Sequence, residues 1–376
     1  MAGKDESAMS PTFSVYLDLV RFMAALAVFV HHLASSPFTK GSVWWPLRPY
    51  GAIAVTIFFV LSGYVIAYVS ATRERTAQRY ASARIARLYS VVLIALLLTA
   101  VFDFIGISLN PEFYHFHKVL WKPESWSGYI ASLFLVNEYQ VFDFDGIAPG
   151  SNSAFWSMSF EATYYLIAGL MLFSRRVIAI AFSLLILLLA GRTIAAMLPI
   201  WALGYALYFT HDRIHFRTIP ALGIAVISAL FLLVLPHVSH HLPDGNFGIS
   251  FPWGRGPFER ELLVDYLAAI AISAHLVSVR RLDAPLMKLL DHASTVVRWL
   301  GSLTFPLYCI HVPAICLLAA ISPWSHASMT HLFFISVVTA LLVIAITPLC
   351  EAVKKLLRAT MMQGVQQARH ASGPVL

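Results

Sequence analysis

The chain has 376 residues, of which 59% are hydrophobic and only 12% are charged, and its formal net charge is +7. An average soluble domain has about 25% charged residues, so this composition excludes a protein that covers its core with a charged surface. The apolar residues fall into runs of about 16 to 23, and a helix of about 20 residues crosses the hydrocarbon core of a bilayer. The predicted fold class is therefore all-α, a polytopic transmembrane helical bundle.

Ten apolar segments are predicted to cross the bilayer. In chain order they cover residues 15–34, 52–70, 86–105, 154–173, 177–191, 193–210, 218–236, 261–279, 299–320 and 328–350. A further segment, residues 126–140, lies among Trp and Tyr side chains of the kind that gather at membrane interfaces, and we interpret it as re-entrant or interfacial. The two longer loops, residues 106–153 and 237–260, are then expected on the extracytoplasmic side.

Basic residues in short loops mark the cytoplasmic side of a membrane protein. The loop between the second and third segments is rich in arginine, so we assign it and both termini to the cytoplasm. The later basic clusters fall on the same side, namely Arg175–Arg176, His211–Arg217, Arg280–Arg298 and Lys354–Arg358. The first segment lacks a small-residue cleavage site and is expected to be retained as a helix. We predict one membrane-embedded domain over residues 1–376, with tails at 1–13 and 351–376, in the inner or plasma membrane.

The first predicted helix contains four ionisable residues, Asp18, Arg21, His31 and His32. Asp18 and Arg21 are three apart, so they share a helix face and can pair. Arg21 and His32 are eleven apart, which places them on one face about 16 Å apart along the axis, whereas His31 points about 100° away. An alternative is that Asp18 and Arg21 anchor the inner interface and both histidines lie among outer headgroups.

Further ionisable residues lie in or beside later spans. Glu161 lies about a turn and a half inside its apolar segment, where an unpaired carboxylate is costly. His311 lies in mid-span, and Pro313 is expected to loosen the backbone beside it. Arg84 and Arg87 are one turn apart at the predicted cytoplasmic mouth of the third span. For each of these, the alternative is a structural hydrogen bond or an interfacial anchor.

Together these residues combine histidine, carboxylate and paired arginines, which favours acyl transfer from a phosphorylated carrier. Histidine can deprotonate a hydroxyl near neutral pH, and paired guanidinium groups suit phosphate oxygens. The three cysteines, Cys309, Cys316 and Cys350, lie in apolar runs without metal-ligand spacing and are predicted to be buried thiols. We expect no bound cofactor or metal and no nucleic acid partner.

Five motifs in order resemble the acyltransferase 3 family of membrane-bound O-acyltransferases over nearly the whole chain. LDLVR followed by MAALAVFVHH is similar to that family's LDGLR opening with its Arg-x10-His motif, which selects His32. GAIAVTIFFVLSGY is similar to the GxxGVxxFFVLSGF block, and Arg84 to Tyr89 resembles RxxRIYP. WSMSFE resembles WSLSVEE, and GSLTFPLYCIH resembles GxxSYPLYLLH. Ala54, Ser90 and Ala162 depart from the family pattern, and the last casts doubt on a paired carboxylate.

The resemblance implies that a short acyl group, such as acetyl, passes from acyl-CoA on the cytoplasmic side to a hydroxyl of an envelope or secreted polysaccharide or glycolipid. It implies that His32 deprotonates the acceptor with support from Arg21, and that Glu161 or His311 orients groups at the reacting centre. Arg84 and Arg87 would bind the donor phosphates. The supporting residues predicted from the same motifs are Asp18, Ser62, Trp156 and Tyr308.

Two other functions remain open from the residues. One is acylation of a small natural product such as a macrolide. The other is transport, although transporters often contain internal repeats and none is found in this sequence.

Overall fold

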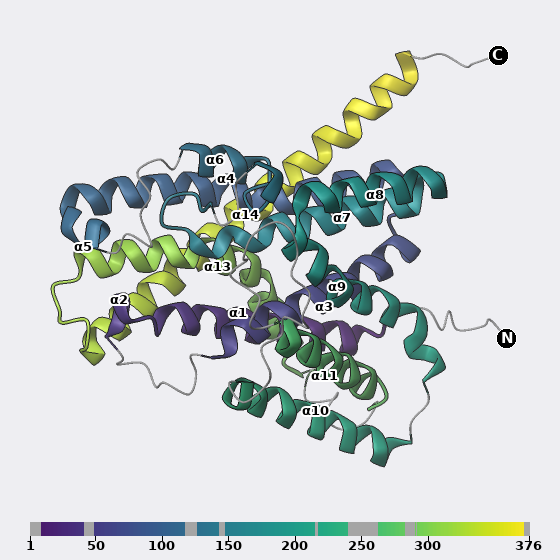
Figure 1. The fold of residues 1–376 in the computed structure, drawn as a ribbon, viewed down its shortest axis with the longest axis horizontal. Helices are drawn as coiled ribbons and strands as arrows, with labels where there is room; N and C mark the ends of the chain where they lie inside the picture. The colour runs from purple at the N-terminus through teal and green to yellow at the C-terminus, as the bar shows by residue number, and fades with distance from the viewer. Residues whose placement is uncertain are drawn as a thin grey trace. The chain divides into compact units, whose positions relative to one another are not determined.

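A computed structural model describes residues 9–40, 49–116, 126–142, 147–214, 217–239, 262–282, 290 and 292–371. Within these ranges the chain is helical and forms no strand, which confirms the predicted all-α class (Figure 1). The chain divides into two compact units. Unit 1 contains Met1–Thr72, Ala190–Thr304 and Ser325–Leu332. Unit 2 contains Arg73–Leu189, Phe305–Trp324 and Phe333–Leu376, so the two units are interleaved along the sequence.

Eight helices are long and apolar enough to cross a membrane. They are α1 (Pro11–Leu33), α3 (Tyr50–Thr72), α4 (Ala77–Leu109), α9 (Arg192–Thr210), α10 (Thr218–Val238), α11 (Leu262–Arg280), α13 (Ser294–Ile321) and α14 (Met329–Ala371). The other two predicted spans are α7 (Ser157–Phe173), with 17 residues, and α8 (Arg176–Ala190), with 15. The chain is thus a multi-pass membrane protein, while ten crossings and cytoplasmic termini stay predictions.

Short helices occupy the segments between the long ones. They are α2 (Ser36–Thr39), α5 (Pro111–Phe116), α6 (Trp126–Leu133) and the 3-10 turns η2 (Gln140–Phe142), η3 (Ser153–Trp156) and η4 (His211–Arg213). The eight residues of α6 span about 12 Å at 1.5 Å per residue, too little to cross a bilayer, in accord with the prediction for residues 126–140.

Helices extend into two segments that were predicted as a loop and a tail. The predicted loop 106–153 is not irregular, because α4 continues to Leu109 and the segment after it contains α5 and α6. The predicted tail after residue 350 continues the helix α14 without a break as far as Ala371 (Figure 1). Of the predicted loop 237–260, residues 240–260 lie outside the described part of the chain, as do residues 283–289 and 291 of the basic segment 280–298.

Capping residues explain where two of the long helices begin. Ser10 precedes Pro11 at the start of α1, and its hydroxyl accepts a hydrogen bond from the backbone N–H of Phe13 at 3.1 Å. Thr76 does the same for the N–H of Arg79 at 3.3 Å at the start of α4. Each cap satisfies one of the donors that the first turn of a helix leaves unbonded.

In unit 1, α3 packs against α9, α1 and α11, and α10 lies beside α11 (Figure 1). Two glycines allow α3 and α9 to touch through their backbones. A Cβ atom on Gly63 would lie 2.1 Å from the carbonyl oxygen of Trp201, and one on Gly204 would lie 2.0 Å from that of Val60. Small residues that permit such close approach are typical of membrane helix pairs.

In unit 2, α4 packs against α5, α6 and α7. Pro313 lies inside α13 without breaking it. Proline lacks the N–H that would bond the carbonyl of Cys309, four residues earlier. The side-chain amide of Asn152 donates to that carbonyl instead, at 2.8 Å. A side chain from another element thus replaces the hydrogen bond that proline removes.

Candidate functional site

The predicted pairing on the first helix is present. Arg21 Nη1 lies 3.4 Å from Asp18 Oδ1, and both side chains are about four-fifths buried. A second cation completes the cluster, because Arg298 at the start of α13 donates to Asp18 Oδ2 at 3.2 Å. A Cβ atom on Gly301 would lie 3.0 Å from that of Asp18, so glycine allows α13 to approach α1 here. Asp18 therefore links two arginines from different helices of unit 1.

The two adjacent histidines differ in their surroundings. His31 packs against the start of α3, where a Cβ atom on Gly51 would lie 2.4 Å from the Cγ atom of its ring. The rings of His31 and His32 meet edge to face, with centroids 5.2 Å apart. Both are partly buried near the end of α1. His31 therefore packs against α3, and the selection of His32 from the motif stays a prediction.

The sequence motif that contains Ser62 lies at the interface between α3 and α9. The indole N–H of Trp201 donates to Ser62 Oγ at 3.2 Å, beside the close approach at Gly63. The hydroxyl of Tyr64 accepts from Arg280 Nη1 at 3.3 Å. This part of the motif therefore stabilises helix packing in unit 1.

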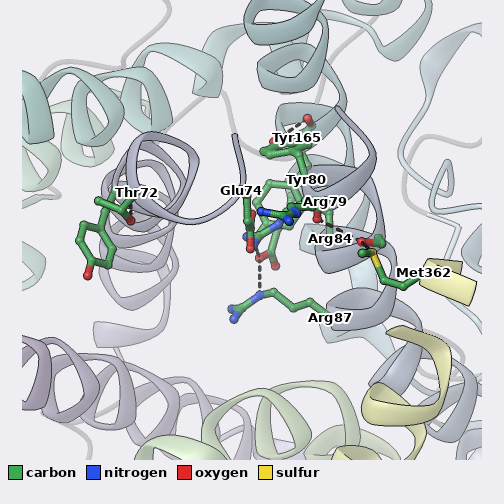
Figure 2. A network of polar contacts seen from close by, with 11 residues as sticks. Thr72, Glu74, Arg79, Tyr80, Arg84, Arg87, Tyr165 and Met362 are labelled. Carbon is green, nitrogen blue, oxygen red and sulfur yellow. Dashed lines mark hydrogen bonds and ion pairs between the residues drawn. The ribbon is translucent and has the colours of Figure 1, made fainter. Parts of the chain in front are cut away.

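Arg84 is engaged by an ion pair inside unit 2. Its Nη2 atom donates to both carboxylate oxygens of Glu74, at 2.7 and 2.8 Å, and the two side chains are only 11% and 9% exposed. The guanidinium carbon also lies 5.7 Å from the ring centroid of Tyr80 and 5.4 Å from that of Tyr165. Arg84 is therefore held by an ion pair and two aromatic rings (Figure 2), while its buried Nε atom has no hydrogen-bond partner among the described residues.

Arg87, one turn further along α4, is held more loosely. Its Nε atom lies 3.7 Å from Glu161 Oε1, which is an ion pair but too long for a hydrogen bond. Tyr165 donates a short hydrogen bond to the same carboxylate oxygen, and the guanidinium lies 5.5 Å from the ring centroid of Phe305. Within the described residues, the terminal nitrogens of Arg87 make no hydrogen bond, and its side chain is 34% exposed. Figure 2 shows the tip of Arg87 pointing away from the network around Arg84.

His311 is fully buried in α13. Its Nδ1 atom lies 3.0 Å from the carbonyl oxygen of Leu307 and 2.9 Å from that of Tyr308. Carbonyl oxygens only accept, so Nδ1 carries the proton, and in the neutral ring Nε2 carries the lone pair. The hydroxyl of Tyr308 accepts from Ser157 Oγ at 2.8 Å, which joins α13 to the start of α7.

The predicted site residues are therefore divided between the two units. Unit 1 contains Asp18, Arg21, His32 and Ser62, while unit 2 contains Arg84, Arg87, Trp156, Glu161, Tyr308 and His311. Within unit 2 the structure brings Arg87 together with Glu161 and places Tyr308 beside His311, with ring centroids 6.2 Å apart. Trp156 packs edge to face on Phe160, the residue before Glu161.

The sequence analysis did not identify two polar residues, Asp265 and His275, that form hydrogen bonds inside the apolar helices of unit 1. Asp265, which is 4% exposed, accepts a hydrogen bond of 2.5 Å from Thr56. His275 bonds the hydroxyl of Tyr16 through Nε2 and the carbonyl of Ala225 through Nδ1, the latter at 2.9 Å. An ionisable residue inside an apolar run was the available signal for both.

Glu74 and Arg298 were missed as well. Both lie in or next to basic segments that were predicted to be cytoplasmic, where an ion-pair partner cannot be distinguished from a topological charge by sequence alone. The predicted burial of all three cysteines is confirmed. Among the residues with described positions, no group of three or more His, Cys, Asp or Glu could hold a metal ion.

Comparison with known proteins identifies the class of protein to which the chain belongs. The sequence model of the acyltransferase 3 family, described as an acyltransferase domain, matches residues 14–349. A polytopic helical bundle with this match is a membrane-embedded acyltransferase. The chain belongs to the acyltransferase 3 family.

One curated relative and the solved structures complete the comparison. Acyltransferase MdmB from Streptomyces mycarofaciens is 32% identical over 151 residues, which cover 39% of this chain and 36% of that protein. The chain thus matches little more than a third of that relative's length. No solved structure matches the chain.

Proposed function

We propose that this enzyme transfers an acetyl or other short acyl group from acyl-CoA to a hydroxyl of an envelope or secreted polysaccharide or glycolipid, in the cell membrane. In the reaction, the acceptor oxygen forms a bond to the acyl carbon while the bond from that carbon to the CoA sulfur breaks. The products are an ester and a free thiol. No redox partner or bound cofactor is required, and acyl-CoA is a co-substrate.

The observation that carries the donor assignment is the environment of Arg87. Its charge is partly balanced by Glu161, yet its terminal nitrogens are not used by any described residue and its side chain is 34% exposed. A planar guanidinium with two available nitrogens suits a phosphate or diphosphate group. Arg84, by contrast, is bound to Glu74. We therefore propose that Arg87 contacts the donor phosphates and that Arg84 supports it.

The acceptor side of the reaction is assigned to His32. A neutral imidazole can accept the proton of a hydroxyl as that oxygen attacks a thioester. The cluster of Asp18, Arg21 and Arg298 fixes the earlier part of the same helix, because it joins α1 to α13. In unit 2, Glu161 orients Arg87, and His311 is held in one tautomer by its own helix.

The test uses two donors that differ in their phosphates. Acetyl-CoA carries three phosphate groups, whereas S-acetylpantetheine has the same thioester and none. Purified protein in lipid nanodiscs is assayed for thiol release with each donor. A charge-assisted contact is worth about 1.5–3 kcal/mol, so Arg87→Ala should raise the KM for acetyl-CoA about tenfold or more. Turnover of S-acetylpantetheine should change by less than about twofold, because it has no phosphate to lose.

Two variants serve as controls. Arg87→Lys keeps a cation beside Glu161 and should retain more donor affinity than Arg87→Ala, although it loses the planar fork. Arg79→Ala removes an exposed arginine from the first turn of the same helix and should leave the KM unchanged. Equal losses for both donors in Arg87→Ala would contradict phosphate binding. An absence of thiol release by the wild-type protein with any hydroxyl acceptor would contradict the proposed donor.

A further inference from the structure

Two carboxylates of unit 2 meet the arginines of α4 in different ways. Glu74 brings both of its oxygens to Nη2 of Arg84, at 2.7 and 2.8 Å. Glu161 stays 3.7 Å from Nε of Arg87, which is too far for a hydrogen bond. Because hydrogen bonds strengthen an ion pair, a carboxylate that is free to move is expected to close on a neighbouring guanidinium. The long distance at Arg87 therefore indicates that another group holds Glu161 in place.

The group that holds Glu161 is the hydroxyl of Tyr165. Tyr165 lies four residues after Glu161 on α7, the spacing at which side chains on a helix meet. Its hydroxyl donates a short hydrogen bond to Oε1 of Glu161, the same oxygen that faces Arg87. Among the residues with described positions, this is the one hydrogen bond that the Glu161 carboxylate makes.

Tyr165 is itself fixed by the network around Arg84 (Figure 2). Its side chain is buried, and the guanidinium carbon of Arg84 lies 5.4 Å from its ring centroid. The hydroxyl of Tyr80 donates to the backbone carbonyl of Tyr165 at 2.9 Å. A buried ring packed in this way has little room to move. Tyr165 therefore cannot follow Glu161 toward Arg87, and its hydroxyl is a fixed point for the carboxylate.

The position of Glu161 determines what Arg87 can bind. The terminal nitrogens of Arg87 make no hydrogen bond to any described residue, and its side chain is 34% exposed. A guanidinium binds a phosphate group through these nitrogens. A carboxylate that closed on them, as Glu74 does on Arg84, would compete with the phosphate for the same donors. The hydrogen bond from Tyr165 prevents this competition.

We propose that Tyr165 is a positioning residue, whose hydroxyl keeps Glu161 from closing on Arg87 and so leaves the terminal nitrogens of Arg87 available to the donor phosphates. The effect on donor binding rests on the proposed role of Arg87, whereas the effect on Glu161 does not. The arrangement also gives a physical route by which the Arg84 network supports Arg87, because Tyr165 contacts Arg84 through its ring and Glu161 through its hydroxyl.

The first test compares two tyrosines that both lie against Arg84. Tyr165→Phe removes the hydroxyl that bonds Glu161 and keeps the ring. Tyr80→Phe is the matched control, because its ring lies 5.7 Å from the same guanidinium carbon and its hydroxyl bonds the backbone of Tyr165. The full chain in nanodiscs is assayed for kcat and KM with acetyl-CoA and with S-acetylpantetheine. Thermal unfolding is measured on the same preparations.

The expected results distinguish positioning from packing. Tyr165→Phe should raise the KM for acetyl-CoA about tenfold, the effect of one lost charge-assisted contact, and change kcat and the turnover of S-acetylpantetheine by less than about twofold. Tyr80→Phe should lower the melting temperature and change the KM by less than about twofold, because it leaves Glu161 in place. A purely structural role for Tyr165 would instead lower the melting temperature and leave the KM unchanged.

A second variant tests the proposed cause. Glutamine at position 161 keeps the size of the side chain but has no charge with which to hold Arg87. In a Glu161→Gln background, Tyr165→Phe should therefore change the KM for acetyl-CoA by less than about twofold, in contrast to its effect in the wild-type chain. A further tenfold rise in that background would show that Tyr165 does not act through Glu161.

Chemical modification provides a readout that needs no donor. Phenylglyoxal reacts with the terminal nitrogens of arginine, and its rate at Arg87 is followed by peptide mass spectrometry. Tyr165→Phe should slow the modification of Arg87 and leave that of Arg79, exposed in the first turn of α4, unchanged. Adding Glu161→Gln should restore the rate at Arg87.

Each outcome bears on one of the two claims. An unchanged rate of modification at Arg87 in Tyr165→Phe would overturn the proposal. So would an unchanged KM in Tyr165→Phe when Arg87→Ala raises it. If the modification slows as expected while Arg87→Ala leaves the KM for acetyl-CoA unchanged, the donor role of Arg87 is refuted and the positioning role of Tyr165 is retained.

Discussion

The ion pair between Arg84 and Glu74 leads to a prediction that distinguishes a structural role of Arg84 from a role in donor binding. Both side chains are close to nine-tenths buried, and one guanidinium nitrogen donates to both carboxylate oxygens. Removing one partner of a buried pair costs about 3–5 kcal/mol, because the other charge remains without compensation. Arg84→Ala and Glu74→Ala should therefore each lower the free energy of unfolding by about 3 kcal/mol.

The size of this effect makes it measurable as thermal stability. For a chain of this size, 3 kcal/mol corresponds to a fall in melting temperature of roughly 5 °C. The assay is thermal unfolding in detergent micelles, with the KM for acetyl-CoA measured on the same preparations below the transition. Because Arg84 is bound to Glu74, its loss should change that KM by less than about threefold, against tenfold or more for Arg87→Ala.

A double variant provides the control. Arg84→Met combined with Glu74→Leu removes both charges and keeps side chains of similar volume, so most of the lost stability should return. The reasoning is refuted if Arg84→Ala unfolds at the wild-type temperature and raises the KM as strongly as Arg87→Ala. That result would assign Arg84 directly to the donor phosphates.

Two further predictions follow from local contacts. His32→Ala should lower turnover about a hundredfold or more, as expected for loss of a general base, whereas His31→Ala should lower thermal stability and reduce turnover far less; equal losses of turnover would contradict the assignment. Asn152→Ala should cost about 1–3 kcal/mol of unfolding free energy, because the carbonyl of Cys309 is left without a partner. In a Pro313→Ala background the new N–H can bond that carbonyl, so the same substitution should cost measurably less, and a double-mutant cycle without coupling would contradict this account.

The parts of the structure that sequence predicts well depend on neighbouring residues. The apolar runs and the pairing of Asp18 with Arg21 are both set within a few positions of the chain. The choice of His32 over His31 also depends on short-range spacing, because one residue changes the direction of a helical side chain by about 100°, and it stays a prediction. These features required no knowledge of which helices are neighbours.

The remaining features depend on contacts between distant segments. Sequence treats Arg84 and Arg87 as equivalent, because they lie on one face of one helix with similar neighbours. They differ because Glu74 reaches Arg84, whereas Glu161, from α7, lies beside Arg87. The replacement of the hydrogen bond lost at Pro313 likewise comes from a side chain more than 150 positions earlier. Such partners follow from tertiary packing and not from any local pattern.

The reciprocal glycine contacts between α3 and α9 have a mechanical consequence. At Gly63 and Gly204 each backbone lies against a carbonyl of the other helix, with no side chain between them that could change rotamer. Two surfaces in such contact cannot slide by a turn without driving the side chains on either side of the glycines into the opposite backbone. These two helices are therefore expected to move as one rigid pair within unit 1. Any movement of α1 during a catalytic cycle is therefore expected to take place relative to this rigid pair of helices.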